Sequence, residues 1–534
     1  MSRTGARRGL GRRPFRRVRS PEHHSAWGCP SLTTRQHTIG DLLRRSAARF
    51  PDKTAVIYGN LRQSYADLDL EVNRTANALA ERGVAKGDRF ALFSHNNHAF
   101  VVAYFALARL GAISVPINFM LGPREVAYIL EHSGATGMLV EEALLPVAEA
   151  AAGPAVRVRG VIGTAGGWES FASWRGDDAE PEVEIADDDP IQLMYTSGTE
   201  SRPKGATLSG RSLLAQYVSC VIDGEMSHDD VEVHALPLYH CAQLHCFLTP
   251  GVYLGATNLI LPGADPASIL ATIEGERATK LFCPPTVWIG LLRHPDFDRR
   301  DLSSLRKGYY GASIMPVEVL KEISSRLPDV RLFNFYGQTE MAPLATILRP
   351  EEQLTRLGSA GRPALNVETR IVGDDDEPVP PGVVGEIVHR SPHAMLGYWN
   401  DPETTAEAFR GGWFHSGDLG VMDADGYLSV VDRKKDMIKS GGENVASREV
   451  EEVIYQHPAV AEAAVFGVPD ERWIEAVTAA VVLREGAGLT SAELTAFLRE
   501  RLAAFKTPKN VVFVESLPKN ASGKVLKREL RARF

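Results

Sequence analysis

From Thr38 onward, short hydrophobic runs alternate with longer segments in which hydrophobic residues recur every three to four positions. The short runs are typical of buried strands and are 53–58, 89–93, 113–116 and 136–140. The longer segments predict helices and are 64–83, 97–110 and 123–133. Strands that alternate with helices of this length predict a mostly parallel sheet covered by helices on both faces.

The same alternation resumes after a polar interruption. Residues 163–190 contain several glycines and the acidic run 187–189, which predicts a surface linker. Further strand and helix patterns follow at 191–194, 266–276, 280–283, 316–327 and 331–336. Residues 357–431 are rich in glycine, proline and short β-branched runs, which indicates a small β-barrel or an antiparallel sheet. About the last hundred residues carry their own helices and strands and predict a separate domain.

The composition is that of a soluble globular protein with more than one core. A chain of 534 residues is expected to divide into at least two domains. The net charge of −8 argues against a nucleic-acid partner, because such binding needs a basic surface. Five scattered cysteines predict a reducing compartment and a cytoplasmic location. The most hydrophobic stretch, 99–117, is interrupted by Arg109 and Gly111, so no transmembrane span is predicted, and peripheral membrane contact stays open.

Residues 1–36 differ from the rest of the chain. Eight arginines precede the first acidic residue, Glu22, which is the composition of an organellar transit peptide. The pair Arg12-Arg13 resembles a twin-arginine signal, but no hydrophobic region follows it, so export is not expected. We predict a disordered basic extension or a start codon placed too early.

The segment 195–209 carries the strongest chemical signal. Three hydroxyls surround a glycine, and one lysine follows after a short polar turn; these residues are Thr196, Ser197, Gly198, Thr199 and Lys204. A backbone that wraps a polyphosphate needs a close approach, hydrogen-bond donors and a cation. The spacing is not that of a Walker A loop, because Gly205 stands where a Mg²⁺-binding hydroxyl would follow the lysine. The alternative is an ordinary glycine-rich loop.

Four further segments combine polar groups with glycine or aromatic residues, at 336–340, 412–420, 432–445 and 518–524. The first ends a predicted strand, at the sheet edge where α/β proteins bind ligands. Each segment alone also fits an ordinary surface turn. His240-Cys241 and His245-Cys246 suggest a soft metal site, but zinc pairs are spaced differently and need a second pair, so no such site is predicted.

Taken together and in this order, these segments resemble the adenylate-forming superfamily of acyl-CoA synthetases, luciferases and peptide-synthetase adenylation domains. The resemblance covers about residues 38–530 and is closest to bacterial fatty-acyl-CoA synthetases, which 236–240, 311–313 and 397–399 also fit. It implies an α/β fold with a large N-terminal domain of doubly wound sheets plus a small β-barrel, and a mobile, smaller α+β C-terminal domain. The domains expected are 37–431 and 437–534, with a hinge at 432–436.

The resemblance implies two half-reactions. A carboxylate attacks the α-phosphorus of ATP to give an acyl-adenylate and pyrophosphate, and the thiol of CoA then displaces AMP. The first step needs positioning and charge neutralisation more than a protein base, because the carboxylate is already ionised at neutral pH. A monomer or homodimer is expected.

Roles for the nucleotide site also follow from the resemblance. The residues implied to hold the β- and γ-phosphates are Thr196, Ser197, Gly198, Thr199 and Lys204. Thr196 and Glu340 would bind Mg²⁺, a hard cation that takes few protein oxygens. Tyr336 would stack on adenine, Thr339 would reach the α-phosphate, and Asp418 would accept the ribose hydroxyls beside Arg433. The other nucleotide-site residues implied are Gly311, Ala312, Ser313 and Gly337.

The resemblance also implies a moving catalytic lysine. Lys524 would bridge the substrate carboxylate and the α-phosphate, and His240 would form a wall of the acyl site. Lys524 must then leave so that CoA can enter, with Lys435 at the hinge. The residues implied to reach the site for thioester formation are Lys439, Gly441 and Gly442. The sequence departs from the family at Glu200-Ser201, where Thr-Gly is usual, so the contacts of 200–202 are left open.

The acid and the acceptor are open at this stage. We expect a hydrophobic acyl pocket built from about 236–250, 282–290 and 308–316, and a medium- or long-chain fatty acid rather than an aromatic acid. The alternatives are a fatty-acyl-AMP ligase or aryl-acid ligase that loads another thiol acceptor, such as a carrier protein, and a non-catalytic nucleotide-binding protein.

Overall fold

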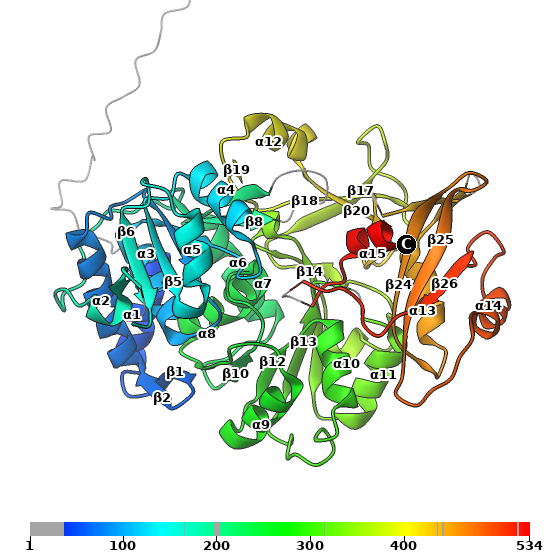
Figure 1. The fold of residues 1–534 in the computed structure, drawn as a ribbon, viewed down its shortest axis with the longest axis horizontal. Helices are drawn as coiled ribbons and strands as arrows, with labels where there is room; N and C mark the ends of the chain where they lie inside the picture. The colour runs from blue at the N-terminus through cyan, green and yellow to red at the C-terminus, as the bar shows by residue number, and fades with distance from the viewer. Residues whose placement is uncertain are drawn as a thin grey trace, which may run out of the picture. The chain divides into compact units, whose positions relative to one another are not determined.

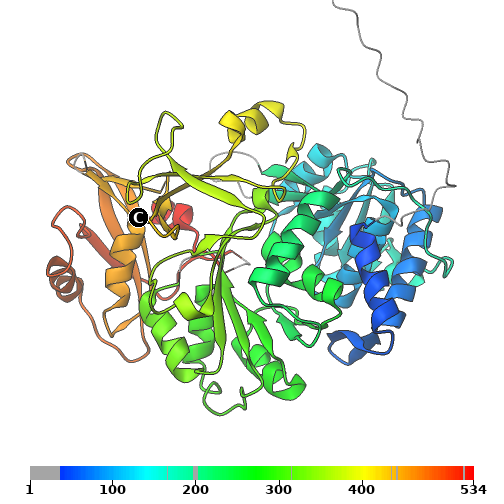
Figure 2. The same cartoon turned by 180° about the vertical axis from the view of Figure 1, so that it is seen from behind.

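The computed structural model describes residues 37–164, 166–196, 203–313, 315–434, 436–440, 443–520 and 523–534. The predicted basic extension, 1–36, lies outside these ranges, so its prediction stays untested. Residues from His37 to Phe534 form one compact unit, in which two large sheets are followed along the chain by two smaller ones. Figures 1 and 2 show the ribbon from front and back.

The first large sheet carries the predicted phosphate loop at one side. Within the described ranges its strands run, in spatial order, β19 (Gly397–Tyr398), β9 (Lys204–Ser209), β8 (Pro190–Thr196), β4 (Ile113–Pro116), β3 (Arg89–Phe93), β5 (Gly137–Glu141), β6 (Val158–Ile162) and β7 (Glu169–Ser170). The strands from β8 to β7 are parallel, whereas β9 and β19 pair antiparallel. The sheet is therefore mostly parallel, as predicted.

The second large sheet has the same character. Its described strands, in spatial order, are β16 (Arg362–Pro363), β15 (Leu344–Leu348), β14 (Arg331–Gly337), β13 (Lys307–Gly311), β12 (Lys280–Phe282), β10 (Val231–His234), β11 (Thr257–Ile260), β1 (Thr54–Tyr58) and β2 (Leu61–Ser64). The strands from β14 to β1 are parallel, and the pairs at both edges are antiparallel. Such sheets bind ligands beyond the carboxyl ends of their strands, and β8, β13 and β14 end at predicted site residues.

Helices cover both large sheets. A shared hydrophobic core joins the two sheets through α1 (Ile39–Arg49), α2 (Tyr65–Glu81), α3 (His98–Leu110), α6 (Gly210–Asp223) and α8 (Thr249–Leu254). The outer face of the first sheet packs against α4 (Pro123–Ser133) and α5 (Leu145–Ala151). The outer face of the second sheet packs against α9 (Pro266–Glu276), α10 (Pro285–Arg293) and α11 (Val317–Arg326). This is the doubly wound arrangement expected from the sequence.

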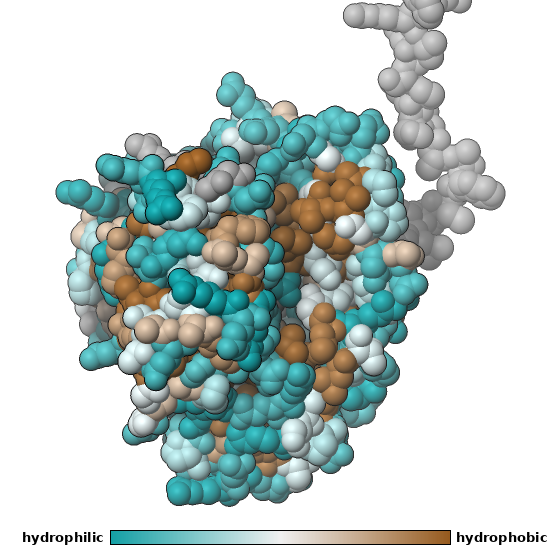
Figure 3. All heavy atoms as spheres, turned by 90° about the vertical axis from the view of Figure 1, so that its right-hand side faces the viewer, coloured by the Kyte–Doolittle hydropathy of each residue, from teal (hydrophilic) through white to brown (hydrophobic). Residues whose placement is uncertain are grey.

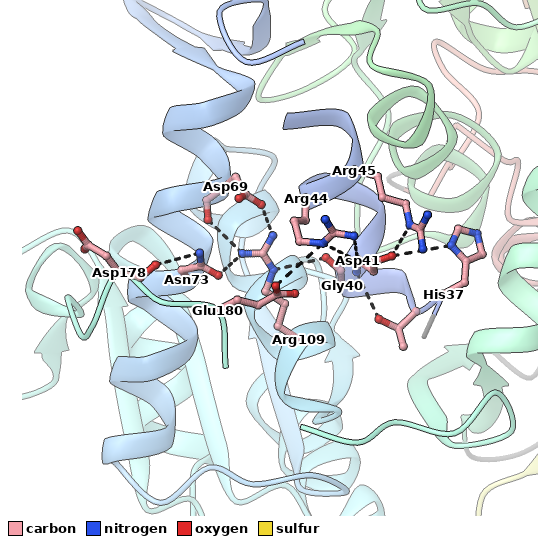
Figure 4. Close-up of polar contacts among 11 residues, drawn as sticks. His37, Gly40, Asp41, Arg44, Arg45, Asp69, Asn73, Arg109, Asp178 and Glu180 are labelled. Atoms are coloured by element: carbon pink, nitrogen blue, oxygen red, sulfur yellow. Dashed lines mark hydrogen bonds and ion pairs between the residues drawn. The ribbon is translucent and has the colours of Figure 1, made fainter. Parts of the chain in front are cut away.

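A buried arginine ties the inner helices together. Arg109, in the last turn of α3, is almost fully buried and forms an ion pair with Asp69 and a hydrogen bond to Asn73, both on α2 (Figure 4). Its guanidinium also donates to the carbonyl oxygen of Gly40 on α1, at 3.4 Å. Arg109, the charged residue that interrupts the hydrophobic run 99–117, is therefore paired and hydrogen-bonded inside the protein.

The predicted surface linker is partly wrong. Residues 163–190 are mostly irregular, but Trp174 is fully buried, and Phe171 and Ile185 are nearly so. Trp174 fills the space beside Gly160, where a Cβ would lie 2.4 Å from the indole ring. Isolated hydrophobic residues in a polar segment give no periodic signal, so this packing was not visible in the sequence.

The two smaller sheets follow in the chain. The third is antiparallel, as predicted for 357–431, and consists of β17 (Glu368–Val372), β18 (Gly385–Arg390), β20 (Phe414–Met422) and β21 (Leu428–Arg433). The C-terminal sheet contains β22 (Ile438–Ser440), β23 (Glu443–Val445), β24 (Val460–Asp470), β25 (Ile474–Leu483) and β26 (Asn510–Phe513). Its helices are α13 (Ser447–Tyr455), α14 (Ser491–Arg499) and α15 (Lys527–Arg533). The α+β character of the C-terminal part is confirmed.

The remaining helical segments are short. They are α7 (Cys241–Gln243), a π-helix (Leu244–Leu248), α12 (Pro402–Ala408) and 3₁₀ turns at Glu142–Leu144, Phe171–Ser173, Thr339–Met341, Pro350–Glu352 and Arg410–Gly412. Within the described ranges, no helix combines the length and the hydrophobicity needed to cross a lipid bilayer. On the face drawn in Figure 3, hydrophilic side chains separate the hydrophobic patches from one another.

Candidate active site

The predicted phosphate loop connects two antiparallel strands. Strand β8 ends at Thr196 and β9 begins at Lys204, and the two residues are partners in the ladder. The Thr196 hydroxyl donates to the carbonyl oxygen of Lys204 at 3.5 Å, which holds the base of the hairpin together. The other loop residues of the prediction, Ser197, Gly198 and Thr199, lie outside the described residues, as do Glu200 and Ser201.

Tyr398 links the hairpin to the predicted metal-binding carboxylate. The Lys204 ammonium lies 5.3 Å from the centroid of the Tyr398 ring, a cation–π distance. The Tyr398 hydroxyl donates to Glu340 Oε1 at 2.9 Å. Lys204 and Glu340 therefore flank one aromatic ring although 136 residues separate them (340 − 204).

The two predicted metal ligands both offer oxygen. Thr196 offers a hydroxyl and Glu340 a carboxylate, and both are hard ligands of the kind that Mg²⁺ prefers. Mg²⁺ usually takes only one or two protein ligands and completes its shell with phosphates and water. The part of the chain that the structure describes contains no cluster of three or more His, Cys, Asp and Glu side chains that could hold a metal.

Strand β14 delivers Tyr336 to a buried carboxylate. The Tyr336 hydroxyl donates to Asp418 Oδ2 at 2.7 Å, and burial together with this carboxylate raises the pKa of Tyr336. Arg433 lies opposite Asp418 in the β20–β21 ladder, with its Nε 3.3 Å from Asp418 Oδ1. Asp418 is 6% exposed, and its Oδ1 accepts no hydrogen bond from the described residues.

Two glycines allow the strand ends to approach other backbone closely. A Cβ at Gly337 would lie 1.9 Å from the carbonyl oxygen of Pro343, and one at Gly311 would lie 2.2 Å from that of Phe335. Both distances exclude any side chain at these positions. The residue after Gly311, Ala312, has φ of 63°, so the chain turns sharply where β13 ends. Ala312 and Ser313 are exposed at that turn.

His240 stands at the start of α7. Its Nδ1 accepts a hydrogen bond from the amide of Ala242 at 3.3 Å, so the neutral ring carries its proton on Nε2. Burial, reinforced by the positive charge of Lys524, lowers the pKa of His240 to about 4. The ring is therefore neutral at physiological pH. Thr339, also predicted for this site, contacts Cys241 Sγ through its hydroxyl at 3.2 Å.

The Lys524 loop is docked against the N-terminal part of the protein. Thr286, in the first turn of α10, donates to the carbonyl oxygen of Gly523 at 2.9 Å. Gly523 has φ of +79°, and a Cβ there would lie 2.6 Å from the Thr286 hydroxyl, so glycine is required. The amide of Lys524 donates to Asn520 Oδ1 at 2.8 Å and keeps the loop turned. In Figure 1 the red segment before α15 reaches across toward β13 and β14.

The residues predicted for thioester formation are placed differently. Lys439 lies on β22 with an exposed side chain, and its amide donates to Glu475 Oε2 at 2.7 Å. Lys435, Gly441 and Gly442 lie outside the described residues. Of the residues predicted for thioester formation, the structure thus describes Lys439 alone, which lies on the C-terminal sheet and contacts Glu475.

A small cavity lies beside His240. Its volume is about 10 Å³, which is room for about one water molecule and not for an acyl chain. The lining residues all come from the three segments expected to form the acyl pocket, and they are Leu236, Pro237, His240, Ala242, Gln243, Phe282 and Ala312. The pocket must open to admit a substrate.

Three residues of this region were missed by sequence reasoning. Tyr398 was noted only as part of a matching motif. It contacts both Lys204 and Glu340 because β19 pairs with the distant strand β9, and no local sequence pattern predicts that pairing. Thr286 lies in the predicted N-terminal domain, yet it holds the Lys524 loop of the predicted C-terminal domain. Gln243 is a buried amide in a segment for which no element was predicted, and only its polarity among hydrophobic neighbours could have marked it.

Comparison with known proteins agrees with this geometry. The family model of the AMP-binding enzymes matches residues 43–399, and that of the AMP-binding enzyme C-terminal domain matches 449–524. The chain is 40% identical over 501 residues to a feruloyl-CoA synthase from Amycolatopsis, covering 94% of this chain and 100% of the relative. It is 35% identical over 506 residues to the long-chain-fatty-acid–CoA ligase FadD13 of Mycobacterium tuberculosis, covering 93% and 98%.

A solved structure extends the likeness to three dimensions. The anthranilate CoA ligase AuaEII, solved in complex with anthranoyl-AMP, superposes with a TM-score of 0.87 at 29% identity, covering 93% of this chain and 97% of that one. Both relatives and the solved structure are named as CoA ligases or synthases. The chain therefore belongs to the AMP-binding enzyme family and is an AMP-forming acid–thiol ligase.

Proposed function

We propose that this protein is an ATP- and Mg²⁺-dependent CoA ligase that activates an aromatic carboxylic acid. The observation that supports the proposal is the docked Lys524 loop: Thr286 donates a hydrogen bond to Gly523, and the positive charge of Lys524 acts on His240, which lines the cavity. An ammonium group at this point can neutralise charge between two reacting anions.

The adenylation step would use the residues of the candidate active site as follows. Lys204 and the hairpin hold the β- and γ-phosphates, and Lys524 lies between the acid's carboxylate and the α-phosphate. The carboxylate oxygen attacks phosphorus while the bond to the bridging oxygen breaks and pyrophosphate leaves. Both reactants are anions, so alignment and fixed positive charge lower the barrier more than proton transfer would. The neutral ring of His240 cannot add to this charge and would instead form a wall of the acyl site.

The nucleotide would be held by the residues predicted from the sequence. Tyr336 offers a ring face to adenine, and the unpartnered Oδ1 of Asp418 can accept a ribose hydroxyl. Arg433 would help to hold this carboxylate in place, with its Nε 3.3 Å from Oδ1. Thr196 and Glu340 would hold Mg²⁺, whose positive charge would help to neutralise the triphosphate. Thr339 and the turn Gly311–Ala312–Ser313 would border the α-phosphate and the base.

Domain movement would separate the two half-reactions. We propose domains at 37–431 and 437–534 with a hinge at 432–436. The C-terminal residues have their own sheet and their own hydrophobic clusters, which supports their movement as one body. Turning about the hinge would withdraw Lys524 and bring Lys439, with Gly441 and Gly442, to the cleft for attack by the CoA thiol.

An aromatic acid is favoured over a fatty acid by two observations. The feruloyl-CoA synthase shares 40% of its residues with this chain and FadD13 shares 35%. Gln243, a fully buried residue whose Oε1 has no partner among the described residues, lines the cavity, and an alkyl chain beside it would leave that oxygen unpaired. The likeness to FadD13 keeps the medium- or long-chain fatty acid, predicted from the sequence, as the second candidate.

The test is release of pyrophosphate by the purified protein with ATP and Mg²⁺. Cinnamic, indoleacetic, medium-chain and long-chain acids are compared, with and without CoA, and the acyl product is identified by mass. We expect the highest kcat/KM with an aromatic acid and a CoA thioester as product. A higher kcat/KM with a fatty acid would select the second candidate, and formation of acyl-AMP without any CoA thioester would indicate a carrier-protein acceptor.

A further inference from the structure

Gln243 is a buried amide with an unused acceptor beside the acyl cavity. It ends α7, three residues after His240, is fully buried and lines the cavity next to that histidine. Its Oε1 has no hydrogen-bond partner among the described residues. Most buried polar atoms are paired, so an unpaired carbonyl oxygen at a substrate cavity indicates a missing donor.

A chain of hydrogen bonds fixes which way this amide points. It begins at Asn258, whose Nδ2 donates to the backbone carbonyl oxygens of Ala55 at 3.0 Å and Ala256 at 3.1 Å. Backbone carbonyls can only accept, so the Asn258 amide cannot be reversed. Asn258 Oδ1 must therefore be the atom that faces His234 Nε2, at 2.9 Å.

His234 passes this orientation on to Gln243. Because Asn258 Oδ1 is an acceptor, His234 Nε2 carries a proton and donates. Complete burial lowers the pKa of His234 to about 3, so the ring has only this one proton and its Nδ1 is an acceptor. Gln243 Nε2 lies 2.7 Å from Nδ1 and must donate to it. The amide nitrogen is thus held by His234, and Oε1 is the end left without a partner.

We propose that Gln243 is a specificity-determining residue whose Oε1 accepts a hydrogen bond from a hydroxyl or N–H group on the acyl part of the acid. The inference rests on the proposed ligase function and narrows it to aromatic acids that carry a donor. A site built to receive a donor discriminates strongly against an isostere that lacks it, because the buried acceptor is then left unpaired.

A second buried amide provides a matched control. Gln216, on α6, is also fully buried, and its Oε1 is likewise unpartnered among the described residues. Its Nε2 donates to the thiols of Cys220 and Cys246 rather than to a histidine. Gln216 is not among the residues that line the cavity. Its substitution therefore perturbs a comparable buried amide without changing the proposed contact.

The experiment measures kcat/KM for pyrophosphate release with two pairs of acids. 4-Hydroxycinnamate is compared with 4-methylcinnamate, and indole-3-acetate with benzothiophene-3-acetate, so that size is kept while the donor is removed. In the wild type we expect the donor acid of the pair that is accepted to be favoured about 10- to 100-fold. Gln243→Met should bring the ratio of the two kcat/KM values to within about threefold of one, chiefly because kcat/KM falls for the donor acid. Gln216→Met should leave this ratio unchanged.

Activity with fatty acids but with neither aromatic pair would overturn the proposal, because the proposal requires an aromatic acid that carries a donor. No donor preference in the wild type overturns the proposal without any variant, as does a preference that survives in Gln243→Met or in the shortened Gln243→Asn. In that case Oε1 contacts only a buried water. If Gln243→Met does not fold, Gln243→Asn provides the comparison. Failure of the wild type to release pyrophosphate with any acid would instead overturn the ligase function itself, and this proposal with it.

Discussion

Asp418 has two carboxylate oxygens in different surroundings. Oδ2 accepts the Tyr336 hydroxyl, while Oδ1 faces Arg433 without a geometrically good hydrogen bond. Such an arrangement holds the carboxylate still and leaves one oxygen available to a ligand. The sequence motif predicted this acid at the ribose, but not that Tyr336 would orient it.

We expect Asp418→Asn to raise the KM for ATP by about 10- to 100-fold, because a hydrogen bond to a charged acceptor is replaced by a weaker one. The measurement is the KM for ATP, and for 2′- and 3′-deoxy-ATP, in pyrophosphate release at a saturating acid concentration. The penalty for the missing hydroxyl should shrink in the variant. Glu368→Gln, an exposed acid on the same sheet, should change neither value. Equal effects of both substitutions would contradict the role of Asp418.

At the scale of single residues, sequence motifs predicted the chemistry of a side chain better than they predicted which residues it contacts. The types of Lys204 and Lys524 pointed to anion binding and that of Glu340 to cation binding, because few other side chains can do either. The bridging role of Tyr398 and the orientation of Gln243 could not be predicted, since each depends on partners from distant strands.

Helix ends account for much of what was predicted at the scale of elements. Ser64 caps α2 by accepting from the Asp67 amide at 3.1 Å, and Asn97 caps α3 by accepting from that of Phe100 at 2.9 Å. Gly111 ends α3 in the left-handed conformation. Because these caps are local, the sequence places the helix ends within one or two residues. No element was predicted for the segment of α7, the π-helix and α8, although Gly255 ends α8 in the left-handed conformation as well.

The Arg109 cluster makes a prediction at this scale. Arg109→Met leaves Asp69 without its partner in a largely buried place, and we expect the free energy of unfolding to fall by about 3–5 kcal/mol. The measurement is the urea midpoint and slope. The control is Lys321→Met, which breaks an exposed ion pair with Glu318 on α11 and should cost less than about 1 kcal/mol. A similar loss in both variants would show that the buried cluster has no special importance.

Buried neutral histidines link the whole molecule to pH. Burial lowers the pKa to about 4 for His240 and His393, and to about 3 for three others, which are His234, His245 and His389. The unfolded values lie near 6.5. Between these limits the unfolded chain binds more protons than the folded one, so stability is full above about pH 6.5 and falls as the pH drops toward 4.

Each of these histidines contributes up to about 1.4 kcal/mol per pH unit below its unfolded pKa. Glu232 and Glu452 act in the opposite sense, because burial raises the pKa of both, that of Glu232 to about 7, but they are two groups against five. We therefore expect the urea midpoint to decrease steadily from pH 7.5 to pH 5. A midpoint that stays level or rises over this range would contradict the neutral state of the histidines.

The arrangement of whole domains was predicted from the resemblance rather than from periodicity. Alternating strands and helices predicted parallel sheets, but not that two sheets would share one layer of helices. The docking of the Lys524 loop on Thr286 could not be read from the sequence either, because the two segments are far apart in the chain and meet only after both parts have folded.

The most direct test of the account compares the two half-reactions in Lys524→Ala. Acid-dependent exchange of labelled pyrophosphate into ATP reports the first, and CoA thioester formation from supplied acyl-AMP reports the second. Removing the ammonium should lower the first by about 100- to 1,000-fold. It should leave the second within a few-fold of wild type, because the proposed domain movement would by then have withdrawn Lys524. Equal losses in both half-reactions, or full exchange activity in the variant, would contradict the role assigned to this lysine.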